Sequence, residues 1–243
     1  MSGSSESAWG ALAEVPRLGL AWAFAFAVSR GVFPSRSLSF SNRVVSVVHA
    51  VVSAGLCAPL LGGAVDLFHP FDSPCGPNTG EQRRAMLWST GYFVYDFLCC
   101  AYVAVREDPK MLDLEGALHH VATLSGLVYG LVGGHCGATL TLCLLTMEVS
   151  NPFMHGRFLM KELGIRDTTL NVVNDVLFAS IFFLCRILLG PVQVHAMLVD
   201  ERTPLPVKAG GVGIQLISFY WFYLIVKMAR KTLAGPTKRK GVH

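Results

Sequence analysis

Residues 117–134 read ALHHVATLSGLVYGLVGG, eighteen consecutive positions without a charged side chain. A helix needs about 20 mostly apolar residues to cross the hydrocarbon of a bilayer. The stretch therefore predicts a transmembrane helix. It carries an adjacent histidine pair, His119-His120, just inside its first turn.

The rest of the chain repeats this pattern. Its 243 residues are 52% hydrophobic and 15% charged, whereas soluble domains carry about 25% charged residues. Apolar blocks long enough to span a bilayer alternate with short polar segments. The sequence predicts an all-α, polytopic membrane helix bundle with about seven transmembrane helices, near residues 11–29, 44–65, 86–105, 117–134, 137–155, 172–194 and 209–229.

The basic residues predict the orientation of this bundle, because cytosolic loops carry an excess of Lys and Arg. With seven spans and a cytosolic C-terminus, fourteen Lys and Arg residues fall on the cytosolic side and five on the other. We therefore expect the N-terminus outside the cell or in a lumen. The net charge of +4 reflects this bias and an attraction to anionic lipid, so we expect no nucleic-acid partner.

The seven cysteines show neither a C-x-x-C motif nor the His and Cys spacing of a structural zinc site, so we expect no metal site. Cys75 and Cys136 fall in non-cytosolic loops of this topology and are candidates for a disulfide in an oxidising lumen. The other five lie in predicted spans, where a thiol packs as a small apolar group: Cys57, Cys99, Cys100, Cys143 and Cys185.

Ionisable and amide side chains are few in the predicted spans, and such groups are costly to bury in a membrane. Because consecutive spans run in opposite directions, most of these residues fall in the cytosolic half of the bilayer. We expect them to line one cavity that opens to the cytosol. The set comprises His49, Asp96, His119, His120, Glu148, Asn151, Asn171, Asn174 and Asp175.

The histidine pair has a specific geometry. Neighbours on a helix point about 100° apart, so His119 and His120 cannot both face one partner directly. One ring can meet a substrate while a neighbouring helix holds the other. A neutral imidazole can act as a general base or as an acyl-accepting nucleophile, and Asp96 or Glu148 is the candidate acid that fixes its tautomer. This combination suits acyl transfer to a lipid amine or hydroxyl.

The same polar residues also have a structural interpretation, because His, Asp and Asn can hold membrane helices together through hydrogen bonds. Both interpretations stand equally for His49 and Asp96, while a functional one is favoured for the histidine pair. Asn151 precedes Pro152, which predicts a helix end or a kink. Arg186 is expected to pair with an acid or to reach the membrane interface.

Several protein classes are disfavoured. The chain has none of the H-x-x-H-H or H-x-x-x-H boxes with which membrane di-iron oxidases hold two metals. It also lacks the glycine-rich loops that bind nucleotide phosphates. We find no internal repeat, which disfavours a secondary transporter.

Five segments resemble the TLC-domain family, which is named after the TRAM, LAG and CLN proteins and includes the ceramide synthases. They are FSNRVVSVVHA (40–50), GYFVYDF (91–97), LEGALHHVATLSGL (114–127), MEVSNPFMHGRFLMKELG (147–164) and RILLGP (186–191). The resemblance divides the chain into an N-terminal segment with the first transmembrane helix (1–39), a TLC domain (40–230) and a basic cytosolic tail (231–243).

Within the family, the chain is most similar to the small TLC domain-containing proteins, whose fifth segment carries E-x-S-[NT]-P-F, here Glu148 to Phe153. Ceramide synthases are similar at His119, His120 and Thr123, but they carry paired aspartates in the later helix where this chain has the glutamate-proline motif. The resemblance implies an endoplasmic reticulum membrane protein of lipid metabolism, whose bundle surrounds a cavity for a long acyl chain.

The leading hypothesis is a ceramide-synthase-like acyltransferase with acyl-CoA as co-substrate, a sphingoid base as acceptor and no bound cofactor. His119 and His120 would provide base and nucleophile, with Asp96 or Glu148 as orienting acid. The competing hypothesis is a non-catalytic protein that binds or senses membrane lipids and regulates lipid homeostasis. A channel or transporter would need polar residues in both leaflets, and here they cluster largely in one. Candidate substrate-binding residues are His49, Asn151, Asn174 and Asp175.

Overall fold

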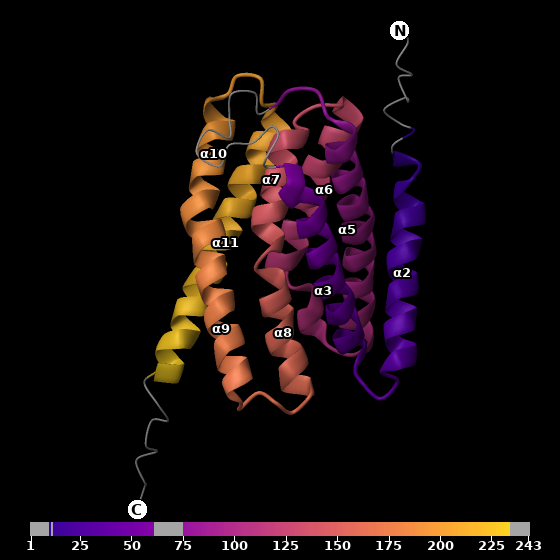
Figure 1. The fold of residues 1–243 in the computed structure, drawn as a ribbon, viewed down its shortest axis with the longest axis vertical. Coiled ribbons are helices and arrows are strands. Elements are labelled where there is room, and N and C mark those ends of the chain that lie inside the picture. The colour runs from indigo at the N-terminus through magenta and orange to yellow at the C-terminus, as the bar shows by residue number, and fades with distance from the viewer. Residues whose placement is uncertain (1–9, 11, 61–74, 234–243) are drawn as a thin grey trace, which may run out of the picture.

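The computed structural model describes residues 10, 12–60 and 75–233. These residues form a bundle of seven helical rods (Figure 1). A 3₁₀ turn, η2 (Pro109–Leu112), lies between the third and fourth rods. In chain order the rods are α2 (Val15–Val32); α3 (Leu38–Cys57) with η1 (Ala58–Leu60); α5 (Gly80–Arg106); α6 (Leu114–Gly133); α7 (Gly137–Glu148) with α8 (Asn151–Glu162); α9 (Thr169–Phe182) with η3 (Phe183–Leu189) and α10 (Gly190–Val199); and α11 (Leu205–Leu233).

Each expected apolar segment coincides with one rod, which confirms the all-α prediction. One clear difference is at α5, which begins at Gly80 rather than at residue 86. The Thr79 hydroxyl accepts from the Gln82 N–H (3.2 Å), and the Gln82 side-chain oxygen accepts from the Thr79 N–H (3.0 Å). This capping box starts the helix on polar residues, where hydropathy gives no signal. The end of the predicted span 44–65 lies outside the described residues.

The rods alternate in direction, so connections gather at two ends (Figure 1). One end holds the α2–α3, α5–α6 and α8–α9 connections, and the other holds the α6–α7 and α10–α11 connections. A ring forms because α3, α5, α6, α11, the α9–α10 rod and α8 each pack against the next. Helix α2 lies outside this ring, against α3 and α5.

The α7–α8 rod changes neighbours halfway along its length. Helix α7 packs against α3, α5, α6 and α10 in the centre of the bundle, whereas α8 packs against α3 and α9 in its wall. The change occurs at Val149 and Ser150, just before Pro152. Proline has no N–H to donate to the carbonyl of Glu148, and its ring clashes with that carbonyl in a straight helix. The helix interruption expected at Asn151-Pro152 is therefore confirmed.

Three of the rods are long and apolar enough to cross a membrane: residues 38–60, 169–199 and 205–232. In the last two, only 17% and 11% of the residues in the most apolar window are buried inside the protein. In water, exposed apolar side chains on the outer face of a helix are unfavourable, whereas in a lipid bilayer they are favourable. The fold is therefore a helical membrane bundle. The count of seven crossings stays a prediction.

A disulfide joins Cys75, which precedes α5, to Cys136 in the α6–α7 connection. Asn78 ties the same segments together. Its Nδ2 donates to the carbonyl of Gly130 (2.8 Å), and its Oδ1 accepts from the N–H of Gly137 (2.7 Å). The pair that the sequence offered as a candidate is thus bonded in the structure. It closes the end of the bundle opposite the α8–α9 connection.

Cys75→Ser should lower the free energy of unfolding by roughly 4 kcal/mol, because the disulfide links residues 61 positions apart in the chain. Cys185→Ser removes a free, half-buried thiol and is the matched control. Thermal unfolding of the purified protein in detergent, with and without reductant, measures both. Equal melting temperatures for wild type and Cys75→Ser without reductant would contradict this contribution.

Candidate functional site

A cavity of about 500 Å³ lies inside the ring beside α8. Its wall comes from α3, α5, η2, α6, α7, α8, α9, η3 and α11, so every rod of the ring contributes. Arg43, Lys110 and Arg157 line the part near the α8–α9 end of the bundle. A volume of this size is typical of sites for small molecules or parts of lipids, which occupy about 300–1,000 Å³.

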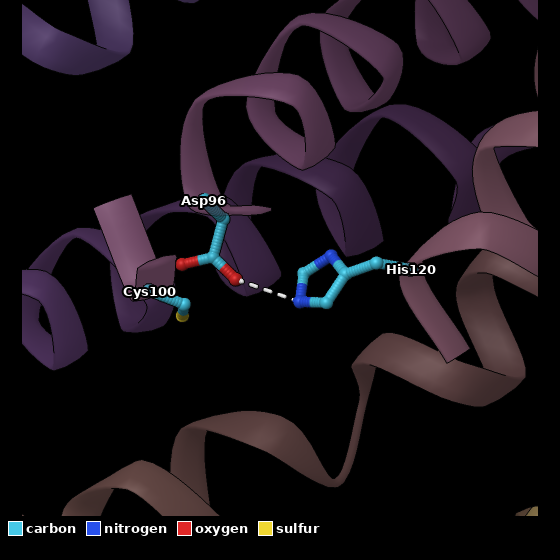
Figure 2. A group of neighbouring side chains, drawn as sticks. All are labelled: Asp96, Cys100 and His120. Atoms are coloured by element: carbon cyan, nitrogen blue, oxygen red, sulfur yellow. Dashed lines mark ion pairs between the residues drawn. The ribbon is translucent and has the colours of Figure 1, made fainter. Parts of the chain in front are cut away.

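The histidine pair lies on α6, and both rings line this cavity. His120 is buried, and its Nε2 lies 3.3 Å from Asp96 Oδ2 on α5 (Figure 2). His119 points elsewhere, with its ring centroid 6.1 Å from that of His120 and 5.3 Å from that of Trp221. The structure thus gives one imidazole an acidic partner and leaves the other against an aromatic ring.

Asp96 is held in place by α3. Asn42 Nδ2 donates to Asp96 Oδ1 (2.8 Å), and the Tyr95 hydroxyl donates to Asn42 Oδ1 (2.8 Å). Each carboxylate oxygen of Asp96 therefore has its own partner, the Asn42 amide on one side and His120 on the other. All these side chains are buried, so the carboxylate is fixed in a single orientation toward His120.

Glu148 has a similar set of partners at the end of α7. Asn151 Nδ2 donates to its Oε2 (3.0 Å), and His49 Nδ1 lies 3.5 Å from the same oxygen. The His49 ring stacks on Tyr92 with 3.6 Å between centroids. Glu148 and Asn151 line the cavity, but His49 does not. In this geometry His49 contacts Glu148 and packs α3 on α5, and the substrate-binding role expected for it stays a prediction.

Two further predicted substrate-binding residues also lie outside the cavity lining. Asn174 Nδ2 donates to the carbonyl of Phe153 (2.8 Å). Asp175 Oδ1 lies 3.3 Å from Arg157 Nε. Both contacts tie α9 to α8 and support the cavity wall, while the ligand-binding role expected for these two residues stays a prediction. The sequence could not distinguish the two roles, because both require polar residues at the same depth.

Arg186 is the buried cation of the site, with 2% of its surface exposed. Its Nη2 donates to the carbonyl of Met147 (2.7 Å). In an uninterrupted helix this carbonyl would accept from the N–H of Asn151, which here lies beyond the interruption. Arg186 thus caps the negative end of the α7 dipole instead of forming the expected direct ion pair or reaching the interface. Its Nε and Nη1 have no hydrogen-bond partner among the described residues. The side chain is one of those that line the cavity, so its charge lies beside any ligand there.

The π-helical segment η3 sets the position of Arg186. A π-helix frees backbone carbonyls from their usual partners and often occurs at functional sites. Here Gln215 Nε2 on α11 donates to the carbonyl of Arg186 (2.9 Å). A Cβ atom at Gly190 would collide with the Gln215 side-chain oxygen, so a larger residue there would force the Gln215 side chain to shift.

A narrower, almost wholly apolar cavity continues from the first one toward the opposite end of the bundle. Phe93, His119 and Glu148 line both cavities, which places His119 at their junction. Beyond His119 the wall includes the small residues Gly126, Gly210 and Gly211, with leucine, valine and methionine side chains around them. The main cavity holds the ionisable side chains and is called the polar chamber below, and the apolar cavity beside it is its apolar extension; together they suit an amphipathic lipid.

Sequence reasoning missed many residues of the cavity wall, among them Arg43, His155 and Trp221. The spacing from Glu148 to Asn151 and His155 is i, i+3 and i+7, which places all three on one helix face and is a signal for His155. Arg43 lies 3.9 Å from the centroid of the Phe158 ring, a contact between α3 and α8 that no sequence pattern indicates.

Three potential metal ligands also converge on this wall. Asp96, Cys100 and His120 each offer a ligand atom within 4.8 Å of the other two (Figure 2). Asp96 and Cys100 are one helical turn apart on α5, and His120 comes from α6. The expectation of no metal site relied on the spacing of Cys and His along the sequence. That spacing gives no information about ligands that come from two different helices.

Arg186→Met should destabilise the protein by about 3–5 kcal/mol, because it leaves the buried Glu148 carboxylate without its nearby cation and the Met147 carbonyl without a donor. Glu148→Gln removes the opposing charge, so the double variant should be more stable than the sum of the single effects predicts. Thermal unfolding of all four proteins in detergent gives the coupling energy. Strictly additive effects would show that the two side chains do not interact.

Comparison with known proteins agrees with this architecture. The family model of the TLC domain matches residues 39–227. A TLC domain-containing protein 4-B of Danio rerio is 26% identical over 84% of this chain and 79% of its own length. TLC domain-containing protein 4 A of Dictyostelium discoideum is 23% identical over 82% of this chain and 78% of its own length.

The likeness extends to fungi. Topoisomerase I damage affected protein 4 of Saccharomyces cerevisiae is 24% identical over 84% of this chain and 73% of its own length. Since the family model covers well over half of the chain, the protein belongs to the TLC domain family.

Proposed function

We propose that this TLC-domain membrane protein of lipid metabolism is an acyltransferase that moves a fatty acyl group from acyl-CoA to the amine of a sphingoid base. The observation that carries the proposal is the position of His119 at the junction of the polar cavity and its apolar extension. An acyl chain in the extension would bring its carbonyl carbon to His119. The polar chamber would then receive the acceptor headgroup.

In the proposed reaction, a His119 ring nitrogen attacks the thioester carbonyl and the carbon–sulfur bond breaks. Coenzyme A leaves as the thiol, taking the proton that the acylated ring loses. The lipid amine then attacks the acyl-imidazole, and the bond from the carbonyl carbon to His119 breaks. His120 accepts the amine proton, with Asp96 stabilising the charged ring, and the proton returns to His119.

Arg186 suits the charge that develops in both steps. Each attack places negative charge on the carbonyl oxygen, and preorganised N–H donors stabilise such an oxyanion strongly in a dry site. Arg186, whose Nε and Nη1 have no hydrogen-bond partner among the described residues, lines the same cavity as the histidine pair. Glu148 is the second candidate acid, and its contacts to His49 and Asn151 give it a supporting role in this scheme.

We extend the proposal to topology: all seven rods cross the endoplasmic reticulum membrane, with the N-terminus luminal and the C-terminus cytosolic. The basic residues Arg43, Lys110 and Arg157 lie toward the end that would face the cytosol, where acyl-CoA is supplied. The disulfide lies at the other end, as expected for an oxidising lumen.

The second candidate is a non-catalytic protein that binds or senses lipids and regulates membrane lipid composition. It is favoured by the difference from ceramide synthases, since the paired aspartates of their later helix are replaced here by the Glu148–Pro152 motif. In this alternative the same cavity would seat a lipid, and the His120–Asp96 pair would bind its headgroup. A channel is disfavoured because the apolar extension provides no polar path to the opposite end.

His119→Ala and His120→Ala should each reduce formation of N-acyl product from acyl-CoA and sphinganine by at least about 100-fold, the usual size of a general acid–base contribution. His195→Ala on α10 is the matched control, because His195 is exposed and lies outside both cavities. Purified protein in detergent–lipid micelles, assayed by mass spectrometry across acyl chain lengths, gives the rates. If wild type makes no more product than the two variants at every chain length, the lipid-binding alternative stands.

A further inference from the structure

We propose that Asp96, Cys100 and His120 form a binding site for a divalent transition-metal ion, with zinc as the best match, on the wall of the main cavity. The three side chains are 7%, 6% and 9% exposed, and their ligand atoms all lie within 4.8 Å of one another. Figure 2 shows one carboxylate oxygen of Asp96 directed at the ring of His120, with Cys100 beside Asp96. Little movement would bring all three onto one ion.

The donor set defines the class of ion. One carboxylate oxygen, one thiolate sulfur and one imidazole nitrogen are together typical ligands of zinc. Magnesium and calcium prefer oxygen ligands alone, so sulfur and nitrogen disfavour them. The charges also balance, because one carboxylate and one thiolate neutralise a doubly charged ion. A neutral assembly is the form that a buried, poorly solvated position tolerates best.

Asn42 supplies the outer contacts that metal ligands usually have. Its Nδ2 donates to Asp96 Oδ1 (2.8 Å) and lies 3.7 Å from Cys100 Sγ. Tyr95 in turn fixes the Asn42 oxygen. One amide therefore orients both α5 ligands and leaves Asp96 Oδ2 free to face His120. Such outer-shell contacts orient ligands and tune metal affinity.

The site has an open side, since all three residues line the main cavity. Three protein ligands with a free fourth position are typical of zinc sites that bind water or substrate, whereas structural zinc sites use four protein ligands. The free position would take a water molecule or an oxygen of a lipid headgroup. This inference does not rest on the proposed acyl transfer and gives His120 a different use, because a ring nitrogen that holds the ion cannot also accept the amine proton.

The test is direct metal binding by the full-length protein. Protein purified with and without added zinc sulfate is analysed for metal by mass spectrometry, and metal-stripped protein is titrated with cobalt(II). We expect one tightly bound zinc per chain and a cobalt–thiolate charge-transfer band. Cys100→Ser and Asp96→Asn should weaken zinc binding at least about tenfold, since even outer-shell changes cost about 10–100-fold.

Cys99→Ser is the matched control, because Cys99 is equally buried on α5 but does not line the cavity. It should keep the zinc and the cobalt band. His119→Ala should also keep the metal while losing acyl transfer, so a failure of the proposed reaction leaves this test intact. Thermal unfolding confirms that each variant is folded. Absence of bound metal in wild type, or a cobalt band unchanged in folded Cys100→Ser, would overturn the proposal.

Discussion

Pro152 interrupts the backbone ladder of the α7–α8 rod at the level of Glu148, and the arrangement of the site depends on this interruption. Before the interruption, α7 fills the centre of the bundle. After it, α8 belongs to the wall of the bundle, and the cavity occupies the centre beside α8. The interruption also frees the carbonyl of Met147, which Arg186 then caps. One proline thus accounts for the cavity, for the buried cation and for the position of Glu148 at the cavity wall.

The buried charges follow a common pattern. Asp96 and Glu148 each meet one asparagine amide and one histidine ring. This satisfies carboxylates that would otherwise be costly to hold in an apolar bundle. The two sets differ in what lies beyond the histidine. His49 is enclosed by aromatic rings, whereas His120 faces the cavity. The same polar arrangement therefore supports packing at one position and offers chemistry at the other.

Much of this fold is readable from the sequence, because a membrane helix must be apolar over its whole length and the seven segments are distinct. The depth of His119, Asp96 and Glu148 follows from the same segments, and so does their meeting in one half of the bundle. Contacts that depend on tertiary geometry were not predictable. No local signal shows that Arg186 would cap α7, that a π-helical turn would present it, or that Cys100 would meet His120.

The central claim is that the polar cavity and its apolar extension hold one lipid chain that passes His119. The test uses a fatty acid that carries a light-activated diazirine near the end of its chain. The fatty acid is cross-linked to the protein in lipid nanodiscs, and mass spectrometry identifies the cross-linked peptides. We predict adducts at residues 122–127 and 207–214 that disappear when unlabelled fatty acid is in excess. Adducts at Leu20 and Phe24, on the exposed face of α2, should persist as non-competed contacts with bulk lipid. Labelling confined to such outer faces, with nothing competed, would contradict the account.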